Sequence, residues 1–458
     1  MSAQGRFILI DHSLVDYAGH HYEYARAVLD AAAEAGYEPV LAANRRFRCE
    51  TREAWPIVPA FKYGVWLHQG APAWQIALWR AWKAVQRGEE CRFSLREKTS
   101  FRGAKSDIGF GDESEMRLHE RGFARARFKA ARQRRFIRDT ANLLDRLAVT
   151  GDDLIFAPTL SLAELESLGE LGRTAPRACR PFWHLLFRRP LGRLSLRERA
   201  LFRSAKDALG ACRFWTDSEE LTAEYRRATD CSFGTLPIPH TAPPGYAARE
   251  PAPLRILYLG DARLEKGFHH LPALVRSLTD DDSARRQFEF YIQSHSTSPI
   301  EEPEITSGRT ELARLADRGV ITLFDVPVAP AQYRELLASG HLAVLPYDPR
   351  AYAARSSGVF AEAVAAGIPT VVPAGTWMAR RTPAGAGLPF HKVEEVPMLI
   401  QTIAADYRNY ASRARSAAED WRQRHNAERL VSLLQEAGGE PIGEAPSRSI
   451  TRLSLSLA

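Results

Sequence analysis

The sequence contains no long apolar run, no paired cysteines and no Gly-x-Gly-x-x-Gly motif. The apolar run from Phe7 to Ile10 is too short for a signal peptide, and no later run is long enough to span a bilayer. The five cysteines are scattered, odd in number and never spaced as Cys-x-x-Cys, which argues against a disulfide framework and a zinc site. We therefore expect a protein of the reducing cytoplasm that uses no dinucleotide cofactor.

Acidic residues are missing between Arg121 and Arg138, a stretch that carries eight Lys or Arg residues. The whole chain has 62 basic and 55 acidic residues, so this stretch accounts for the net charge of +7. A nucleic-acid-binding surface would be broader and no such motif accompanies the stretch, so we expect no nucleic-acid partner. Phe123, Phe128 and Phe136 interleave with the basic residues. The alternatives are a solvated helix face and peripheral contact with an anionic membrane, on its cytoplasmic side.

Two segments of the chain share one pattern, in which a buried strand, a polar loop, a helix and a second strand follow one another. The first has strands at Phe7 to Ile10 and Glu38 to Ala42, and the second begins at Arg255. A length of 458 residues also exceeds what one core usually supports. The sequence therefore predicts two doubly wound α/β domains.

A proline-rich stretch separates the two patterns and indicates a linker. The predicted organisation is an N-terminal domain at 1–240 with an insertion at about 66–148, a linker at 241–253, a C-terminal domain at 254–400, helices at 401–437 and a flexible tail at 438–458. The insertion contains a Trp-rich helix, a polar region without clear periodicity and the basic stretch.

The start of the second pattern carries groups that suit a phosphate. A buried strand from Leu254 ends at Gly260, and a loop with Arg263 and Lys266 leads into a helix. Ligands of open α/β sheets bind at the carboxyl ends of the strands, where these two basic side chains are expected to lie. A loop Arg and Lys would otherwise form a solvated face.

A later segment adds a helix start. After a strand at 342–345 and a polar turn, Ser357, Gly358 and Val359 open a helix that carries Glu362 about one turn in. Free N–H groups and the positive end of the helix dipole suit a phosphate there. Glu362 is an acceptor suited to a ribose diol.

Together these segments resemble the donor-nucleotide motifs of glycosyltransferase family 4, which are retaining enzymes with the GT-B fold. The family pattern Gly-Arg-Leu-x-x-Glu-Lys-Gly is matched at Gly260, Glu265, Lys266 and Gly267. Asp261 stands at the usual Arg position, and Arg263 is the nearest arginine. The resemblance implies two Rossmann-like domains with an interdomain cleft, an acceptor side at 1–240 and a donor-nucleotide side at 254–400. It also implies that the helices at 401–437 cross back to the N-terminal domain.

The same resemblance implies roles for individual residues. Lys266 and Arg263 would stabilise the leaving diphosphate, as would the backbone N–H groups at Ser357, Gly358 and Val359, while Glu362 would hold the ribose. Fixed positive charges and helix N-termini perform that task without a metal, and no cofactor is expected beyond the nucleotide-sugar substrate.

The N-terminal half matches the family more loosely. Gly19 and His20 stand where the family has a glycine-rich, acceptor-side loop. The family also presents a histidine at the carboxyl end of an N-terminal strand beside the donor sugar, and His184 is the candidate for that catalytic position. Trp215 to Glu219 resembles the family's strand that ends in a Ser-Glu pair.

One position departs from the family. Its first glutamate, eight residues before the second, touches the donor sugar, and here that position is Ala354. The expected function is transfer of a sugar from a nucleotide diphosphate to a hydroxyl of a glycan or lipid-linked acceptor, in cell-surface polysaccharide or glycolipid synthesis. The alternatives are a catalytically impaired GT-B protein that binds a nucleotide or glycan as a scaffold, and a sugar-nucleotide epimerase.

Overall fold

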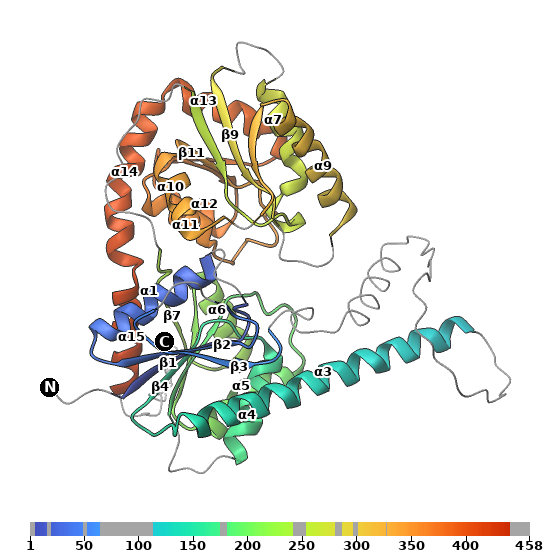
Figure 1. The fold of residues 1–458 in the computed structure, drawn as a ribbon, viewed down its shortest axis with the longest axis vertical. Coiled ribbons are helices and arrows are strands. Elements are labelled where there is room, and N and C mark those ends of the chain that lie inside the picture. The colour runs from blue at the N-terminus through green and yellow to red at the C-terminus, as the bar shows by residue number, and fades with distance from the viewer. Residues whose placement is uncertain are drawn as a thin grey trace, which may run out of the picture.

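The computed structural model describes residues 5–15, 20–48, 53–64, 113–174, 181–240, 253–279, 286–295, 301–326 and 328–439. They form two parallel sheets that lie in separate halves of the molecule (Figure 1). The N-terminal half has a seven-stranded sheet in the order β3-β2-β1-β4-β5-β6-β7. The C-terminal half has a six-stranded sheet in the order β10-β9-β8-β11-β12-β13.

The N-terminal sheet is buried on both faces. Its strands are β1 (Arg6–Asp11), β2 (Glu38–Asn44), β3 (Ile57–Phe61), β4 (Leu154–Ala157), β5 (Phe182–Phe187), β6 (Cys212–Thr216) and β7 (Phe233–Thr235). Its helices are α1 (His20–Glu34), α3 (Glu113–Arg146), α4 (Leu162–Thr174), α5 (Leu196–Leu209) and α6 (Glu219–Thr229). Along β1, Phe7 and Leu9 pack in one core while Ile8 and Ile10 pack in the other. Successive strand residues face opposite sides, so a strand covered on both faces appears as a continuous apolar run.

The C-terminal sheet follows the same plan. Its strands are β8 (Leu254–Tyr258), β9 (Phe288–Gln293), β10 (Ile321–Phe324), β11 (Leu342–Val344), β12 (Thr370–Pro373) and β13 (Gly387–Phe390). The connecting helices are η2 (Leu264–Lys266), η3 (Phe268–His270), α7 (Leu271–Thr279), α9 (Pro303–Asp317), α10 (Pro330–Ser339), α11 (Gly358–Ala365), α12 (Trp377–Arg381), η4 (Val393–Glu395) and α13 (Val396–Ala405).

The strand order reverses at two places, between β1 and β4 and between β8 and β11. Crevices for ligands form outside the carboxyl ends of strands at such switch points. The loop with Lys266 follows β8, and the segment that leads to Glu362 follows β11. The topology therefore brings the two predicted phosphate-binding segments to the same end of one sheet.

The last helices connect the halves. Helix α14 (Tyr407–Arg424) runs along one side of the molecule, and α15 (Ala427–Gly439) lies beside α1 (Figure 1). Leu430 and Leu434 of α15 share a core with Val28 and Leu29 of α1. Where the chain crosses, the N–H of Ile238 donates to Nδ1 of His425 at 3.2 Å.

Part of the predicted insertion is a helix of 34 residues, α3, which at ~1.5 Å per residue is about 50 Å long. Phe136 and Leu143 pack it against the N-terminal core, whereas its N-terminal part extends from the body (Figure 1). The Trp-rich segment lies outside the described residues. No helix among those described combines the length and the apolar character needed to cross a bilayer.

Candidate functional site

A close backbone approach fixes the loop after β8 against the segment after β11. Gly267 has φ +67°, and a Cβ atom built there would lie 1.8 Å from the carbonyl oxygen of Pro346. Only glycine tolerates both the left-handed conformation and this contact. The N–H of Asp348 also donates to the carbonyl of Glu265 at 3.0 Å. The match to the family pattern at Gly267 therefore has a local structural cause.

Lys266 has an ammonium group that is buried and lacks an opposite charge in direct contact. Its side chain is 7% exposed, and within the described ranges it forms no ion pair or side-chain hydrogen bond. The nearest aromatic ring is that of Tyr347, whose centroid lies 5.9 Å from Nζ. Burial lowers the pKa of Lys266 to about 8; the negative charge of Asp261 opposes this shift, and the positive charges of Arg263 and Arg355 add to it. A buried cation in this state attracts an anionic ligand.

Two arginines beside Lys266 are each tied to a carboxylate. Arg263 is ion-paired with Asp261, the residue at the family's usual arginine position. Arg355 donates to Glu265 at 3.0 Å, and its guanidinium lies over the ring of Tyr352, 4.9 Å from the centroid. The structure thus brings the predicted residues Arg263 and Lys266 together and adds Arg355. Their charges outnumber the two nearby carboxylates.

The start of α11 is capped from within. The side chain of Ser357 accepts a hydrogen bond from the N–H of Phe360 at 3.3 Å. The N–H groups of Gly358 and Val359 have no acceptor in the part of the chain that the structure describes. These two donors are therefore available to an anion.

Glu362 lies deeper along the same helix, with 4% of its side chain exposed. It accepts a hydrogen bond from the hydroxyl of Tyr333 on α10. Burial and the negative charge of Glu23 raise the pKa of Glu362 to about 7, although Tyr333 and Lys266 act in the opposite direction. Glu23 belongs to α1 of the other half, so the two halves meet near this carboxyl group.

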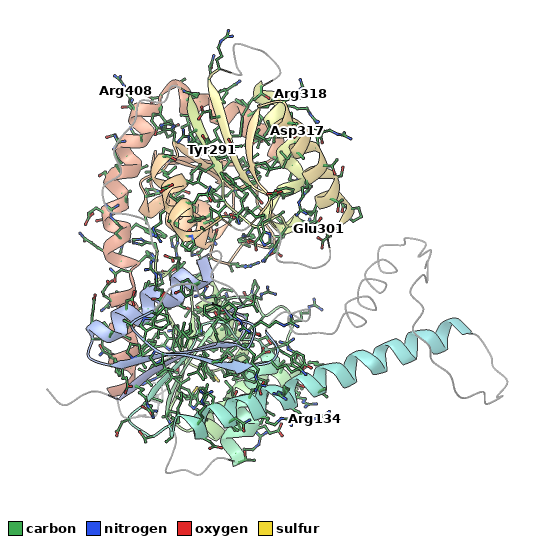
Figure 2. All side chains as sticks on the ribbon, in the orientation of Figure 1. Arg134, Tyr291, Glu301, Asp317, Arg318 and Arg408 are labelled. Atoms are coloured by element: carbon green, nitrogen blue, oxygen red, sulfur yellow. The ribbon has the colours of Figure 1, made fainter. Side chains whose placement is uncertain are left out.

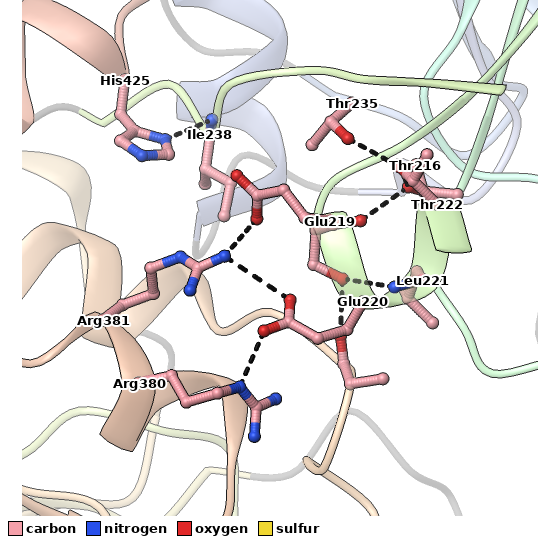
Figure 3. Close-up of polar contacts among 12 residues, drawn as sticks. Thr216, Glu219, Glu220, Leu221, Thr222, Thr235, Ile238, Arg380, Arg381 and His425 are labelled. Carbon is pink, nitrogen blue, oxygen red and sulfur yellow. Dashed lines mark hydrogen bonds and ion pairs between the residues drawn. The ribbon is translucent and has the colours of Figure 1, made fainter. Parts of the chain in front are cut away.

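The halves are joined by polar contacts. Arg334 of α10 pairs with Glu23 at 3.0 Å. At the start of α6, Arg381 of α12 pairs with Glu219 and Glu220, and Arg380 pairs with Glu220 at 2.7 Å (Figure 3). The predicted Ser-Glu pair after β6 is thus part of the contact between the halves.

The structure does not support the catalytic role predicted for His184. This residue is third among the six of β5, and none of its surface is exposed. Its Nδ1 accepts from Nε1 of Trp215 at 3.0 Å, and burial lowers its pKa to about 3. A side chain enclosed in the sheet does not reach a substrate, so we do not retain this role. The predicted acceptor-side residue Gly19 lies outside the described residues; His20 is the first residue of α1, but its side chain lies outside them too.

Arg188, not His184, leaves β5 at its carboxyl end. Its guanidinium lies over the ring of Tyr24, 4.3 Å from the centroid, and its Nε lies 3.7 Å from Asp217. Sequence reasoning missed Arg188: it directly follows an apolar strand, but nothing local indicates its contacts with Tyr24 and Asp217. Among the described residues, no group of three or more His, Cys, Asp or Glu is arranged to hold a metal ion.

No protein-family model matches the sequence, and no curated protein matches it. Solved structures do match. A UDP-forming α,α-trehalose-phosphate synthase from Burkholderia xenovorans has a TM-score of 0.60 at 12% identity, covering 95% of this chain and 100% of that one. WaaG, a glycosyltransferase involved in lipopolysaccharide biosynthesis, has a TM-score of 0.53 at 14% identity, with the same coverages. Anabaena HepE in complex with UDP-glucose has a TM-score of 0.53 at 12% identity, covering 94% and 98%.

The fold is GT-B. The predicted class of two Rossmann-like domains is therefore confirmed, because the likeness extends over both halves. At this level of identity the comparisons establish the fold alone, and the roles of single residues rest on the geometry above.

The raised pKa of Glu362 predicts a pH-dependent stability. With its pKa raised to about 7, Glu362 keeps its proton in the folded chain up to about pH 7, whereas in the unfolded chain it loses the proton near the ordinary glutamate pKa of 4.5. Stability should therefore fall as pH rises between these values. Glu362→Gln removes this loss, so relative to wild type it should gain about 1–3 kcal/mol between pH 5 and pH 8, at ~1.4 kcal/mol per pKa unit.

Urea unfolding at both pH values measures this difference. Glu304→Gln, at an exposed position on α9, is the matched control and should follow wild type. A Glu362→Gln variant whose pH dependence equals that of wild type would show that Glu362 is charged throughout.

Proposed function

We propose that this chain is a retaining glycosyltransferase that moves a sugar from a nucleotide diphosphate to a hydroxyl group of a glycan or lipid-linked acceptor. The observation that carries the proposal is the buried ammonium of Lys266, without an ion pair, at the end of β8 and beside the start of α11. Among the structures with this fold, HepE was solved with UDP-glucose and WaaG acts in lipopolysaccharide biosynthesis. These support a uridine nucleotide donor and a role in surface glycan synthesis.

The proposed chemistry depends on the leaving group. The bond between C1 of the sugar and a diphosphate oxygen breaks, the acceptor oxygen bonds to C1, and the acceptor's proton is released. Negative charge grows on the diphosphate as the bond breaks, so cations that are fixed in place lower the barrier. Lys266 and Arg263, helped by Arg355, would surround the diphosphate, and the N–H groups at the start of α11 would complete its site. Glu362 would accept hydrogen bonds from the ribose.

Release of nucleoside diphosphate from a panel of sugar nucleotides, with and without glycan acceptors, tests the activity.

The second candidate is a GT-B scaffold that binds a nucleotide without turnover. It is favoured by Ala354, which offers no carboxylate and whose carbonyl accepts from Ser218 at 2.6 Å. Tight nucleotide binding without release from any donor would support the scaffold and contradict the enzyme.

Lys266→Ala should weaken UDP binding by about one to two decades, because a charge-assisted hydrogen bond contributes ~1.5–3 kcal/mol. Lys266→Arg keeps the charge and should lose less. Wild-type affinity should itself fall as pH rises through about 8, where Lys266 loses its proton. Titration calorimetry measures the UDP affinity of both variants and of wild type at several pH values. Unchanged affinity in a folded Lys266→Ala protein would contradict the donor site, and exposed Lys392→Ala is the control.

Glu362 is expected to bind the hydroxyl groups of the ribose. Above about pH 7, where Glu362 is ionised, wild type should bind UDP more tightly than 2′-deoxy-UDP, and Glu362→Ala should lose most of that preference, because the carboxylate accepts hydrogen bonds from the ribose diol. Competition binding with the two nucleotides gives the ratio directly. The same ratio in both proteins would assign the ribose contact to another group.

The basic face of α3 is proposed to rest on an anionic membrane, where a lipid-linked acceptor lies. The structure restricts this face, because Arg132 pairs with Glu164 at 2.7 Å, Arg135 pairs with Asp139 at 2.9 Å, and Phe136 is in the core. Exposed basic side chains in the described part of the stretch are Lys129, Arg134 and Arg138.

Changing Lys129, Arg134 and Arg138 to Gln should therefore reduce flotation with vesicles that contain anionic lipid, by about a hundredfold at ~1 kcal/mol per charge. The control is Arg318→Gln with Arg408→Gln, which removes two exposed charges at the opposite end of the molecule and should leave flotation unchanged (Figure 2). Binding should also fall with added salt. If flotation does not depend on the charge of the lipid, or if the three changes do not reduce it, the membrane proposal is wrong and the basic face of α3 is a solvated helix face.

A further inference from the structure

The turn between β6 and α6 in the N-terminal half holds the loop that precedes α11 in the C-terminal half. The hydroxyl of Ser356 donates to Oδ2 of Asp217 at 2.7 Å. The hydroxyl of Ser218 donates to the carbonyl of Ala354 at 2.6 Å. Two consecutive residues of one half therefore fix both ends of a three-residue stretch in the other half.

Asp217 is itself held in place. It is 6% exposed and follows β6 directly, and its Oδ2 also lies 3.7 Å from Nε of Arg188. Arg188 stacks on Tyr24 of α1. A buried carboxylate braced by an arginine and a packed ring offers a rigid acceptor to Ser356, unlike a solvated surface side chain.

The anchored stretch carries groups of the proposed donor site. Arg355, between the two anchors, pairs with Glu265 in the loop of Lys266. Ser357, directly after Ser356, caps α11 and so sets the direction of the N–H groups of Gly358 and Val359. A shift of this stretch would displace the cations and the helix start together, and displacements of about 1 Å are enough to weaken such a site.

We propose that Asp217 is a positioning residue for the nucleotide donor site, acting through Ser356. In this inference, which rests on the proposed function, the site in the C-terminal half is complete only while the N-terminal half is in contact with it. By linkage, a bound nucleotide then favours the contact by the same factor by which the contact favours the nucleotide.

A double-mutant cycle read by UDP calorimetry tests the proposal. Asp217→Ala and Ser356→Ala should each weaken UDP binding about tenfold, and the double variant no more than either alone, because both remove one shared interaction. Asp217→Asn keeps an oxygen that accepts from Ser356 and should stay closer to wild type.

The matched control is Arg381→Gln. It removes the ion pairs of Arg381 with Glu219 and Glu220 at the same contact between the halves (Figure 3). Ion pairs that are partly open to solvent contribute little, and these lie away from the Lys266 loop, so its UDP affinity should stay within about threefold of wild type. If this variant weakens UDP as much as Ser356→Ala does, general loosening of the interface is the cause and the positioning role is wrong.

Hydrogen exchange distinguishes a positioning role of Asp217 and Ser356 from a purely structural one. Adding UDP to wild type should slow exchange of the amides at Ser218 to Leu221, which lie in the half that does not hold the nucleotide. In Ser356→Ala at saturating UDP this protection should be lost. Equal protection in both proteins would overturn the proposal.

Lys266→Ala separates failure of this inference from failure of the proposed function. If Lys266→Ala weakens UDP while Asp217→Ala and Ser356→Ala do not, the donor site stands and the positioning role is overturned. If Lys266→Ala has no effect, or wild type binds none of UDP, GDP and ADP, both are overturned. Should Asp217→Ala fail to fold, Ser356→Ala and Asp217→Asn decide the question.

Discussion

Keeping the ammonium of Lys266 away from water costs free energy unless negative charge lies close to it. Asp261 and Glu265 are near, but they are engaged by Arg263 and Arg355. The group therefore keeps an excess of positive charge, which an anion with several oxygens would neutralise. The left-handed turn at Gly267, the cap at Ser357 and the contact between the halves all maintain this arrangement. The nucleoside diphosphate of the proposed function carries the negative charge that would offset this excess.

The sequence was a good guide to the fold, because strands buried on both faces produce apolar runs and glycines mark the turns that end them. It also predicted that Lys266 and Glu362 follow strands of one sheet, since each comes after a strand by a short, recognisable segment; their roles in a donor site stay predictions. It was a poor guide to His184, because a pattern of apolar residues does not reveal where along a strand a side chain becomes accessible. The contact between Asp217 and Ser356 joins residues 139 positions apart, and nothing local in either segment predicts it. The long helix α3 was missed in part because its sequence lacks a regular apolar stripe over its first turns.

Ala354 shows how the fold accommodates a departure from the family it resembles. A methyl group at this position packs against the N-terminal core, and the backbone carbonyl is held by Ser218. A longer acidic side chain would have to be accommodated at the edge of that core. In the family, the residue at this position touches the donor sugar. Here, Ala354 instead helps to join the two halves. Under the proposed function, recognition of the sugar would depend on groups other than the side chain at position 354.

Helix α15 follows every described strand in the sequence, yet its apolar side chains close the core over α1 and β1. During synthesis the ribosome releases the first strand and helix long before this covering helix exists. The apolar face of α1 must therefore stay exposed, or be shielded by a chaperone, until α15 has been synthesised. A product truncated before residue 427 would contain every strand of the N-terminal sheet but would lack part of its core. Such a fragment would be a target for quality-control proteases rather than a free-standing domain.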